Sequence, residues 1–318
     1  MTDEDVTPQD VVYALATSPD FAQDGVCFAA RTTGLYRSDD GGATWRNAYT
    51  TLDFEGSLPT TAIALSPGFA RDRGVFAGIN GGVVRSPDGG AQWRVAGLGS
   101  PPPLVSALAI SPDYVQDSTL LAGTLEDGVF RSADGGRLWE PWNFGLLDLH
   151  VICMAISPDF ARDETLFLGT ETGVYRSTNG GRAWREVGFP IDAAPVVSLA
   201  LSPGFADDGV LFAGAEACGL FRSDDRGRTW ARLAADALTG AVNAVLLAPG
   251  FPGAADMLVI HEGALRLSRD GGQTWAEATG GAPLPAEVTA VAAPHGLDAG
   301  APLLVGLADG TVRRLAAL

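Results

Sequence analysis

The sequence predicts an all-β fold, a seven-bladed β-propeller, and three observations predict it. A motif of the form S-x-D-x-G-x-x-W recurs six times at intervals of 45 to 48 residues, with Asn in place of Asp in the fourth copy. A second motif, S/A-P-[DG]-[FY], precedes each copy by 20 or 21 residues. Short apolar runs such as TAIALS and TLFLGT lie before and after the second motif, and helical periodicity is absent. Four short strands per repeat of about 45 residues are typical of a propeller blade.

Each repeat is predicted to fold as four antiparallel strands. The order is strand, SPDF-type turn, strand, short Gly loop, strand, Asp-containing turn, strand. We expect one domain over residues 1–318, because the repeat continues through almost the whole chain. The predicted blades are approximately 11–50, 60–98, 104–143, 150–187, 196–235, 241–278, and 287–318 together with 2–9.

The Asp-containing motif has a mechanism as a turn. Its Asp carboxylate accepts backbone N–H bonds and fixes the loop, and its Gly supplies a positive φ. Its Trp begins the fourth strand and packs toward the next blade. We therefore predict a structural role for all of these residues: Ser38, Asp40, Gly42, Trp45; Ser86, Asp88, Trp93; Ser132, Asp134, Trp139; Ser177, Asn179, Trp184; Ser223, Asp225, Trp230; and Ser268, Asp270, Trp275.

The last repeat has no such motif. It supplies three strands, EVTAVAAP, PLLVGLA and GTVRRLAA, and the sequence then ends at Leu318. A ring has no lateral sheet edge only when it closes. We expect residues 2–9 to supply the missing outer strand of this blade; the alternative is a three-stranded last blade.

The six motifs just quoted are Asp boxes, and the sequence resembles the Asp-box (sialidase-type BNR repeat) β-propeller superfamily over residues 11–318. Within it, the chain looks most like photosystem II assembly factor-like and uncharacterised bacterial single-propeller proteins. The superfamily also contains sialidases, xyloglucan hydrolases and sortilin-type receptor domains, so the fold alone does not give the function.

Sialidase chemistry can be tested against the sequence. The resemblance would require three convergent arginines, a Tyr/Glu nucleophile pair and an acidic Asp. In a propeller, the SPDF-type turns and the Asp boxes lie on one face, here called the bottom face, and the remaining loops lie on the opposite top face. Among the loops that we assign to the top face, Arg31 is the only arginine. A carboxylate clamp without arginine forks has no physical basis, so sialidase activity is not expected.

The top-face loops are where we expect a binding site, because variable loops on a rigid scaffold carry function. They combine acids with aromatic residues that do not belong to the repeat, a composition typical of protein-binding surfaces. Trp142 and Phe144 have a second interpretation, in which they plug the channel mouth or the seam between blades three and four. The predicted binding residues are Trp142, Phe144, His150, Glu126, Asp127, Glu171, Glu216, Glu262, His261, Arg31, Tyr49 and Phe54.

No metal or cofactor is predicted. His150, His261 and Cys218 fall on the same face near Asp148, Glu216 and Glu262, but their spacing is long and unpatterned. The three cysteines are far apart and do not form a disulfide framework.

Arginine is also repeated at the end of the third strand. A residue present in every blade is expected to be architectural, pairing with a turn carboxylate or stacking on the Trp of an Asp box. The functional alternative is a basic groove between blades that docks an acidic or C-terminal peptide. The series consists of Arg37, Arg85, Arg131, Arg176, Arg222, Arg266 and Arg313.

Composition excludes several classes of function. All 21 basic residues are arginine, against 38 acids, for a net charge of −17. Without lysine there is no Schiff-base or phosphate-loop lysine, and such an acidic chain is a poor partner for nucleic acid or an anionic membrane. The missing lysine is interpreted as base composition. We see no signal peptide and no apolar stretch of membrane-spanning length, so we expect a cytoplasmic protein.

The acids are predicted to be concentrated on the top face. Its loops hold 11 acids against Arg31. They are Asp53, Glu55, Glu126, Asp127, Asp148, Glu171, Asp192, Glu216, Asp236, Glu262 and Asp309.

We therefore expect a non-catalytic scaffold or assembly factor, a monomeric propeller whose top face binds a protein or peptide bearing a cationic patch. One alternative is a carbohydrate-active enzyme or glycan-binding module that uses top-face carboxylates. Another is a non-catalytic subunit of a larger complex.

Overall fold

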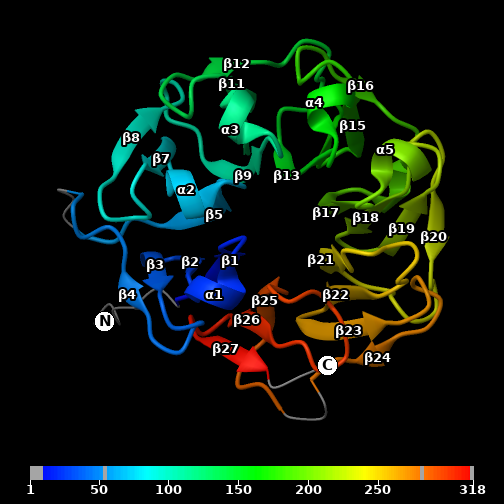
Figure 1. Cartoon of the computed structure of the whole chain (residues 1–318). Helices are drawn as coiled ribbons and strands as arrows, with labels where there is room; N and C mark the ends of the chain where they lie inside the picture. The colour runs from blue at the N-terminus through cyan, green and yellow to red at the C-terminus, as the bar shows by residue number, and fades with distance from the viewer. Residues whose placement is uncertain (1–9, 53–55, 280–282, 316–318) are drawn as a thin grey trace, which may run out of the picture.

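The computed structural model describes residues 10–52, 56–279 and 283–315, and they form a ring of seven antiparallel sheets (Figure 1). This confirms the predicted seven-bladed propeller. Six sheets have four strands in sequence order from the centre outward, and the seventh has three strands within the described residues. The predicted closing strand over residues 2–9 lies outside the described residues.

The strands of each blade are named here in order from the centre. The first strands are β1 (Val12–Thr17), β5 (Thr60–Leu65), β9 (Val105–Ile110), β13 (Val151–Ile156), β17 (Val196–Leu201), β21 (Val242–Leu247) and β25 (Val288–Ala292). The second strands are β2 (Cys27–Arg31), β6 (Val75–Ile79), β10 (Leu120–Thr124), β14 (Leu166–Thr170), β18 (Leu211–Ala215), β22 (Met257–His261) and β26 (Leu303–Leu307). The third strands are β3 (Gly34–Ser38), β7 (Gly82–Ser86), β11 (Gly128–Ser132), β15 (Val174–Ser177), β19 (Gly219–Ser223), β23 (Ala264–Ser268) and β27 (Val312–Leu315). The fourth are β4 (Arg46–Asn47), β8 (Arg94–Gly97), β12 (Glu140–Pro141), β16 (Arg185–Glu186), β20 (Ala231–Leu233) and β24 (Ala276–Glu277).

The core lies between blades rather than in one central cluster. The second strands are covered on both sides by neighbouring blades, which explains why a run such as Leu166–Thr170 is buried at every position. The second glycine of an Asp box fits against the preceding blade: a Cβ on Gly90 would lie 3.2 Å from the Phe28 ring, and Gly90 has φ +93°. Both the backbone angle and the close contact require glycine there.

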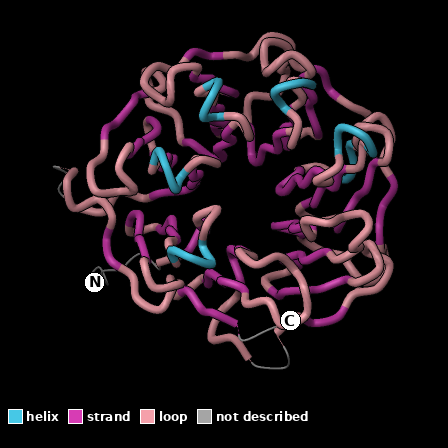
Figure 2. Tube along the Cα trace, in the orientation of Figure 1, coloured by secondary structure: helices cyan, strands magenta, loops and turns pink. Residues whose placement is uncertain are grey.

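The two motifs of each repeat form the bottom face together. The SPDF-type turns contain one-turn helices, which are too short to give helical periodicity and appear around the ring in Figure 2. In blade one, Ser18 Oγ donates to Asp24 Oδ2 at 2.7 Å, and the Asp-box residue Gly41 donates its N–H to Gly25 O at 2.9 Å. The helices are α1 (Phe21–Asp24), α2 (Phe69–Asp72), α3 (Tyr114–Asp117), α4 (Phe160–Asp163) and α5 (Phe205–Asp208); a 3-10 helix, Ile191–Ala193, lies in a top-face loop.

The Asp boxes close as predicted. In the first box, Ser38 Oγ donates to Asp40 Oδ1 at 2.7 Å, and the same carboxylate oxygen accepts the N–H groups of Ala43 and Thr44 at 3.0 and 2.9 Å. Asn179 keeps this arrangement through its Oδ1, which accepts from Ser177 Oγ and Ala183 N–H at 2.9 Å each.

Polar side chains join neighbouring blades near the centre of the ring. At five seams, a hydroxyl or thiol on the first strand of one blade donates to a valine carbonyl on the first strand of the next. At the seam between the last and first blades, Thr289 Oγ1 donates to Val12 O at 2.6 Å. The donors are Thr61, Ser106, Cys153, Ser198 and Thr289.

Within the described residues, no helix is long and apolar enough to cross a bilayer.

Candidate functional site

The top face carries a series of exposed acids. The loop that joins the second and third strands contributes an exposed glutamate in each of blades three to six: Glu126, Glu171, Glu216 and Glu262. Asp127, beside the first of these, is half-buried, and its N–H donates to Thr124 Oγ1 at 3.0 Å. These four exposed glutamates are called the acidic rim below.

Asp148 and His150 lie beside this rim. Asp148 is 9% exposed and its carboxylate accepts the N–H groups of His150 and Thr172, both at 2.9 Å. Burial opposes its ionisation, but these hydrogen bonds outweigh that effect and hold the pKa of Asp148 below its usual range. The half-exposed His150 ring places Nδ1 3.5 Å from Asp148 and 4.0 Å from Glu171 Oε2.

Arg31 is already engaged within its own blade. Its guanidinium lies 4.3 Å from the centre of the Tyr36 ring, and Nη1 is 3.7 Å from Asp10 Oδ2. Burial lowers the pKa of Arg31, an effect that Asp10 opposes. Arg31 therefore stabilises blade one and leaves little of its surface for a ligand.

Two predicted binding residues are buried, so our expectation that they are accessible on the top face was wrong. Tyr49 is 8% exposed because its loop folds against the next blade: the ring packs edge-on against Trp93 at 5.2 Å, and its hydroxyl lies 3.0 Å from Thr60 Oγ1. His261 is 6% exposed because it ends a buried second strand, where Nε2 accepts Gly240 N–H at 3.4 Å. Phe54 lies outside the described residues.

Trp142 lies at the seam between blades three and four rather than at the channel mouth. Two guanidinium groups lie over its ring, with Arg131 4.4 Å and Arg182 5.6 Å from the ring centre. Its backbone carbonyl accepts the indole N–H of Trp184, the Asp-box tryptophan of the next blade, at 2.8 Å. The seam interpretation of the sequence is therefore the correct one for Trp142.

The loop after Trp142 continues along blade four and exposes apolar side chains. Phe144 O accepts Trp184 N–H at 2.8 Å, which holds the loop against blade four, while the Phe144 side chain is 79% exposed. Sequence reasoning missed two exposed leucines: Leu138, which lines a groove of about 200 Å³ with Trp142, and Leu147. The run WEPWNFGLLDLH was the available signal for Leu147, whereas Leu138 lies just before it in the Asp-box turn. Leu138, Trp142, Phe144 and Leu147 are called the blade 3–4 surface.

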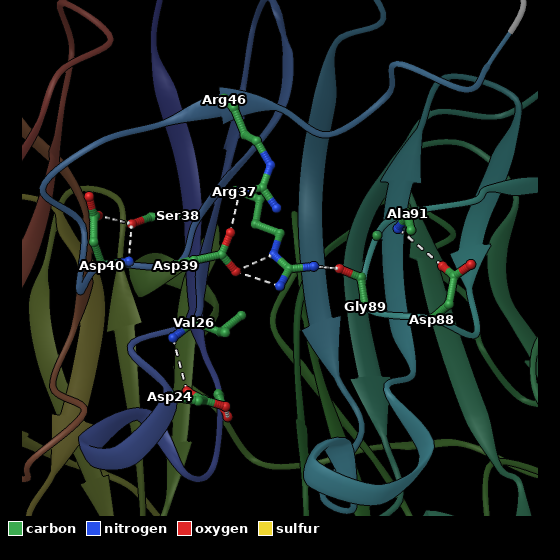
Figure 3. Close-up of polar contacts among 12 residues, drawn as sticks. Asp24, Val26, Arg37, Ser38, Asp39, Asp40, Arg46, Asp88, Gly89 and Ala91 are labelled. Atoms are coloured by element: carbon green, nitrogen blue, oxygen red, sulfur yellow. Dashed lines mark hydrogen bonds and ion pairs between the residues drawn. The ribbon is translucent and has the colours of Figure 1, made fainter.

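The third-strand arginines reach across the seams on the bottom side. Figure 3 shows Arg37 donating to the carbonyl of Gly89 in the next blade's Asp box, while Asp39 binds both Arg37 and Arg46. Arg176 does the same with Arg226 O at 3.2 Å. Pairing of Arg37 and Arg222 with the turn carboxylates of Asp39 and Asp224 agrees with the predicted architectural role, whereas Arg131 stacks on Trp142, which is not a box tryptophan.

Two members of the predicted arginine series were misplaced. In the strand register, the position of Arg37 (opposite Phe28) corresponds to Leu267 (opposite Leu258) in blade six and to Arg314 (opposite Leu304) in blade seven. Arg266 and Arg313 are one residue away and therefore point to the opposite side of their sheets. Without an Asp box in the last blade, the sequence offered no marker for this register.

The residues weighed for a metal do not converge. Within the described residues, no three His, Cys, Asp or Glu side chains are grouped as metal ligands. Cys218 instead directs its thiol to Asp192 O at 3.6 Å, and His261 is buried in a different blade.

No protein-family description and no curated protein matches this sequence. Similarity to solved structures is extensive. Ycf48 bound to a D1 peptide superposes with a TM-score of 0.72 at 15% identity, covering 98% of this chain and 94% of that one. An ancestral GH74 enzyme gives 0.74 at 19% identity, covering 96% of this chain and 44% of the enzyme.

The extracellular domain of a putative one-component system from B. thetaiotaomicron gives a TM-score of 0.69 at 15% identity. The chain covers 98% of its own length but only 39% of that domain. At these identities the similarity concerns the fold, which catalytic and non-catalytic proteins share. The chain is a seven-bladed β-propeller whose fold is similar to those of Ycf48 and the GH74 enzyme.

Proposed function

We propose that the protein is a non-catalytic scaffold that binds a peptide segment of a partner protein at the blade 3–4 surface. The observation that carries the proposal is the exposure of large apolar side chains there: Leu138 is 73%, Phe144 79% and Leu147 84% exposed. Phe144 and Leu147 lie three residues apart in one loop, and an exposed apolar patch is typical of an interaction site. The backbone beneath them is held by hydrogen bonds to Trp184, so the surface is pre-formed.

The charge next to this surface indicates the chemistry of the partner. The loop that carries Leu147 continues directly to Asp148 and His150, beside Glu171 of the acidic rim. A segment that places apolar side chains on the blade 3–4 surface would therefore bring its next residues to carboxylates. We expect an extended peptide that combines apolar or aromatic residues with cationic ones.

Known structures support a peptide as the ligand. Ycf48, which has the same fold over almost its whole length, has been solved with a D1 peptide bound. Its similarity to this chain is limited to 15% identity, so the residues that bind are proposed from this structure alone.

The test is selection of random displayed peptides on the purified protein, followed by calorimetry with the enriched sequences. Phe144→Ser and Leu147→Ser should each weaken binding about tenfold or more, the loss typical of a well-packed interface side chain. Val95→Ser, a 61%-exposed residue on β8 of another blade, is the matched control and should bind normally.

Two results would contradict the proposal. One is that no peptide is enriched, or that enriched peptides bind both variants as well as the parent. The other is hydrolysis of a glycan panel that is lost in Glu171→Gln, which would favour the carbohydrate-active alternative.

A further inference from the structure

The seam between blades four and five contains a basic groove of about 570 Å³ on this acidic protein. Three arginines line it, Arg176, Arg185 and Arg228, against a single acid, Glu186. Thr178 and Asn179 complete its polar wall. A concentration of positive charge in a chain of net charge −17 needs a local explanation.

The arginine pair of this groove differs from the corresponding pair at the seam between blades one and two in having no carboxylate between its members. There, Arg37 and Arg46 face each other across β3 and β4, and Asp39 lies between them and binds both (Figure 3). In blade four, Arg176 and Arg185 face each other in the same register, but Thr178 stands at the position of Asp39. The carboxylate that neutralises the first pair is therefore missing from the second.

A second carboxylate is missing at the next residue. Five of the six Asp boxes keep their aspartate, whereas blade four has Asn179. Of the six Asp boxes in the sequence, only the box of blade four has no acid at either of these two positions. An amide preserves the turn, as the Oδ1 hydrogen bonds of Asn179 show, but it removes the charge.

The arginines themselves carry a structural cost. Like charges directly opposite on neighbouring strands are destabilising. Arg176 Nε is buried, and no described residue accepts its proton. Burial, and then the charges of Arg226 and Arg228, lower the pKa of Arg176. Arg226 also replaces a box glycine at φ +62°, a backbone conformation that side chains oppose.

We infer that this groove binds a phosphate group, as a phosphate monoester or a diphosphate, between Arg176, Arg185 and Arg228. Blade four has no acid at either of the two box positions that blade one fills with Asp39 and Asp40, and these two absent charges correspond to the roughly two negative charges of a phosphate near neutral pH. Three guanidinium groups around one cavity suit a tetrahedral oxyanion, which can accept from all of them, better than a single planar carboxylate. The Thr178 hydroxyl and Asn179 amide add neutral donors.

This site is separate from the blade 3–4 surface and can be tested independently of the proposed function. Calorimetry and ³¹P NMR of the full chain would use two probes, inorganic pyrophosphate and a phosphoserine peptide, which distinguish a small-molecule ligand from a modified protein. Succinate provides a carboxylate of similar charge. We expect at least one phosphate probe to bind more tightly than succinate.

The variants make the test specific. Arg185→Ala and Arg228→Ala, both exposed residues, should each weaken phosphate binding about tenfold or more. Thr178→Asp rebuilds the carboxylate of the first seam and should do the same. Arg46→Ala is the matched control, because Arg46 holds the position of Arg185 in the neutralised seam.

Three results would overturn the inference. They are no binding of either phosphate probe by the parent protein, unchanged binding in Arg185→Ala and Thr178→Asp, or equal affinity for succinate. Loss of binding in Arg46→Ala to the same extent would also contradict it, since that would show general attraction to positive charge. Phe144→Ser should leave phosphate binding unchanged.

Discussion

The aspartate of an Asp box acts as a fixed anion rather than as a reactive group. In three boxes a threonine four residues later donates both its hydroxyl and its N–H to the carboxylate, as Thr44 does to Asp40. These donors, with the serine hydroxyl, hold the pKa of Asp40, Asp225 and Asp270 at about 2. The carboxylates therefore stay ionised until the pH falls to about 2.

This shift predicts a contribution to acid stability. Because the folded-state pKa lies below the unfolded value of roughly 3.9, the stabilisation is present above about pH 4 and is lost as pH falls through about 2. Replacing Asp40, Asp225 and Asp270 together by Asn should flatten the decline of the urea midpoint between pH 5 and pH 2. Asn179 shows that an amide closes the same turn. Glu126→Gln on the opposite face is the control, and an unchanged decline in the triple variant would contradict the prediction.

The residue pattern predicted the Asp boxes well, but it predicted poorly which loop side chains are exposed. A box depends on contacts within a few residues of chain, such as Ser38 with Asp40, and these are readable from the sequence. Tyr49 and Trp142 depend on where a loop meets the next blade. Their positions are set by contacts with Trp93 and Trp184, more than 40 residues away, which no local pattern records.

The repeat predicted where the strands lie, and the serine of each Asp box predicted the register of the third strand that precedes it. Counting back from the box serine places Arg37 and Arg176 correctly, because each directly precedes that serine. Leu267 holds this place in blade six, so the nearby Arg266 was assigned to the wrong position. A shift of one residue turns a side chain to the other side of the sheet. An arginine near the end of the third strand was therefore not enough to assign its position in the register.

At the level of the element, the first strands are joined by side-chain hydrogen bonds that the sequence motifs did not indicate. Thr289 on β25 donates to Val12 O on β1 and so joins the two ends of the described ring. Thr289→Val should lower the free energy of unfolding by about 1–2 kcal/mol, since the substitution keeps the volume but leaves a backbone carbonyl without its donor. Urea unfolding measures this as a lower midpoint.

Thr289→Ser is the matched control for this seam. Serine keeps the hydroxyl, as Ser106 and Ser198 do at other seams, and should stay within about 0.5 kcal/mol of the parent, because only one methyl group of a half-buried residue is lost. Equal destabilisation by serine and valine would show that packing of the methyl group, rather than the hydrogen bond, stabilises the closure.

For the whole molecule, charge is separated by face. The acidic rim contributes one exposed glutamate from each of blades three to six on the top face. The interblade arginines lie at the other end of the third strands, next to the Asp boxes, where Arg37 and Arg176 bond to the next blade. We therefore expect the charge of −17 to be unevenly distributed and the top face to attract a cationic partner.

The last prediction follows from this separation. A decalysine peptide should bind the protein, and its affinity should fall steeply as salt rises from 50 to 300 mM because exposed charges are screened. Replacing Glu126, Glu171, Glu216 and Glu262 by Gln should abolish most of this binding, as measured by fluorescence anisotropy. The control replaces four acids of the bottom-face turns, Asp20, Asp113, Asp159 and Asp207, by Asn, which changes net charge equally. If both quadruple variants lose affinity to the same extent, net charge rather than the acidic rim attracts the peptide, and the rim would not select a cationic partner.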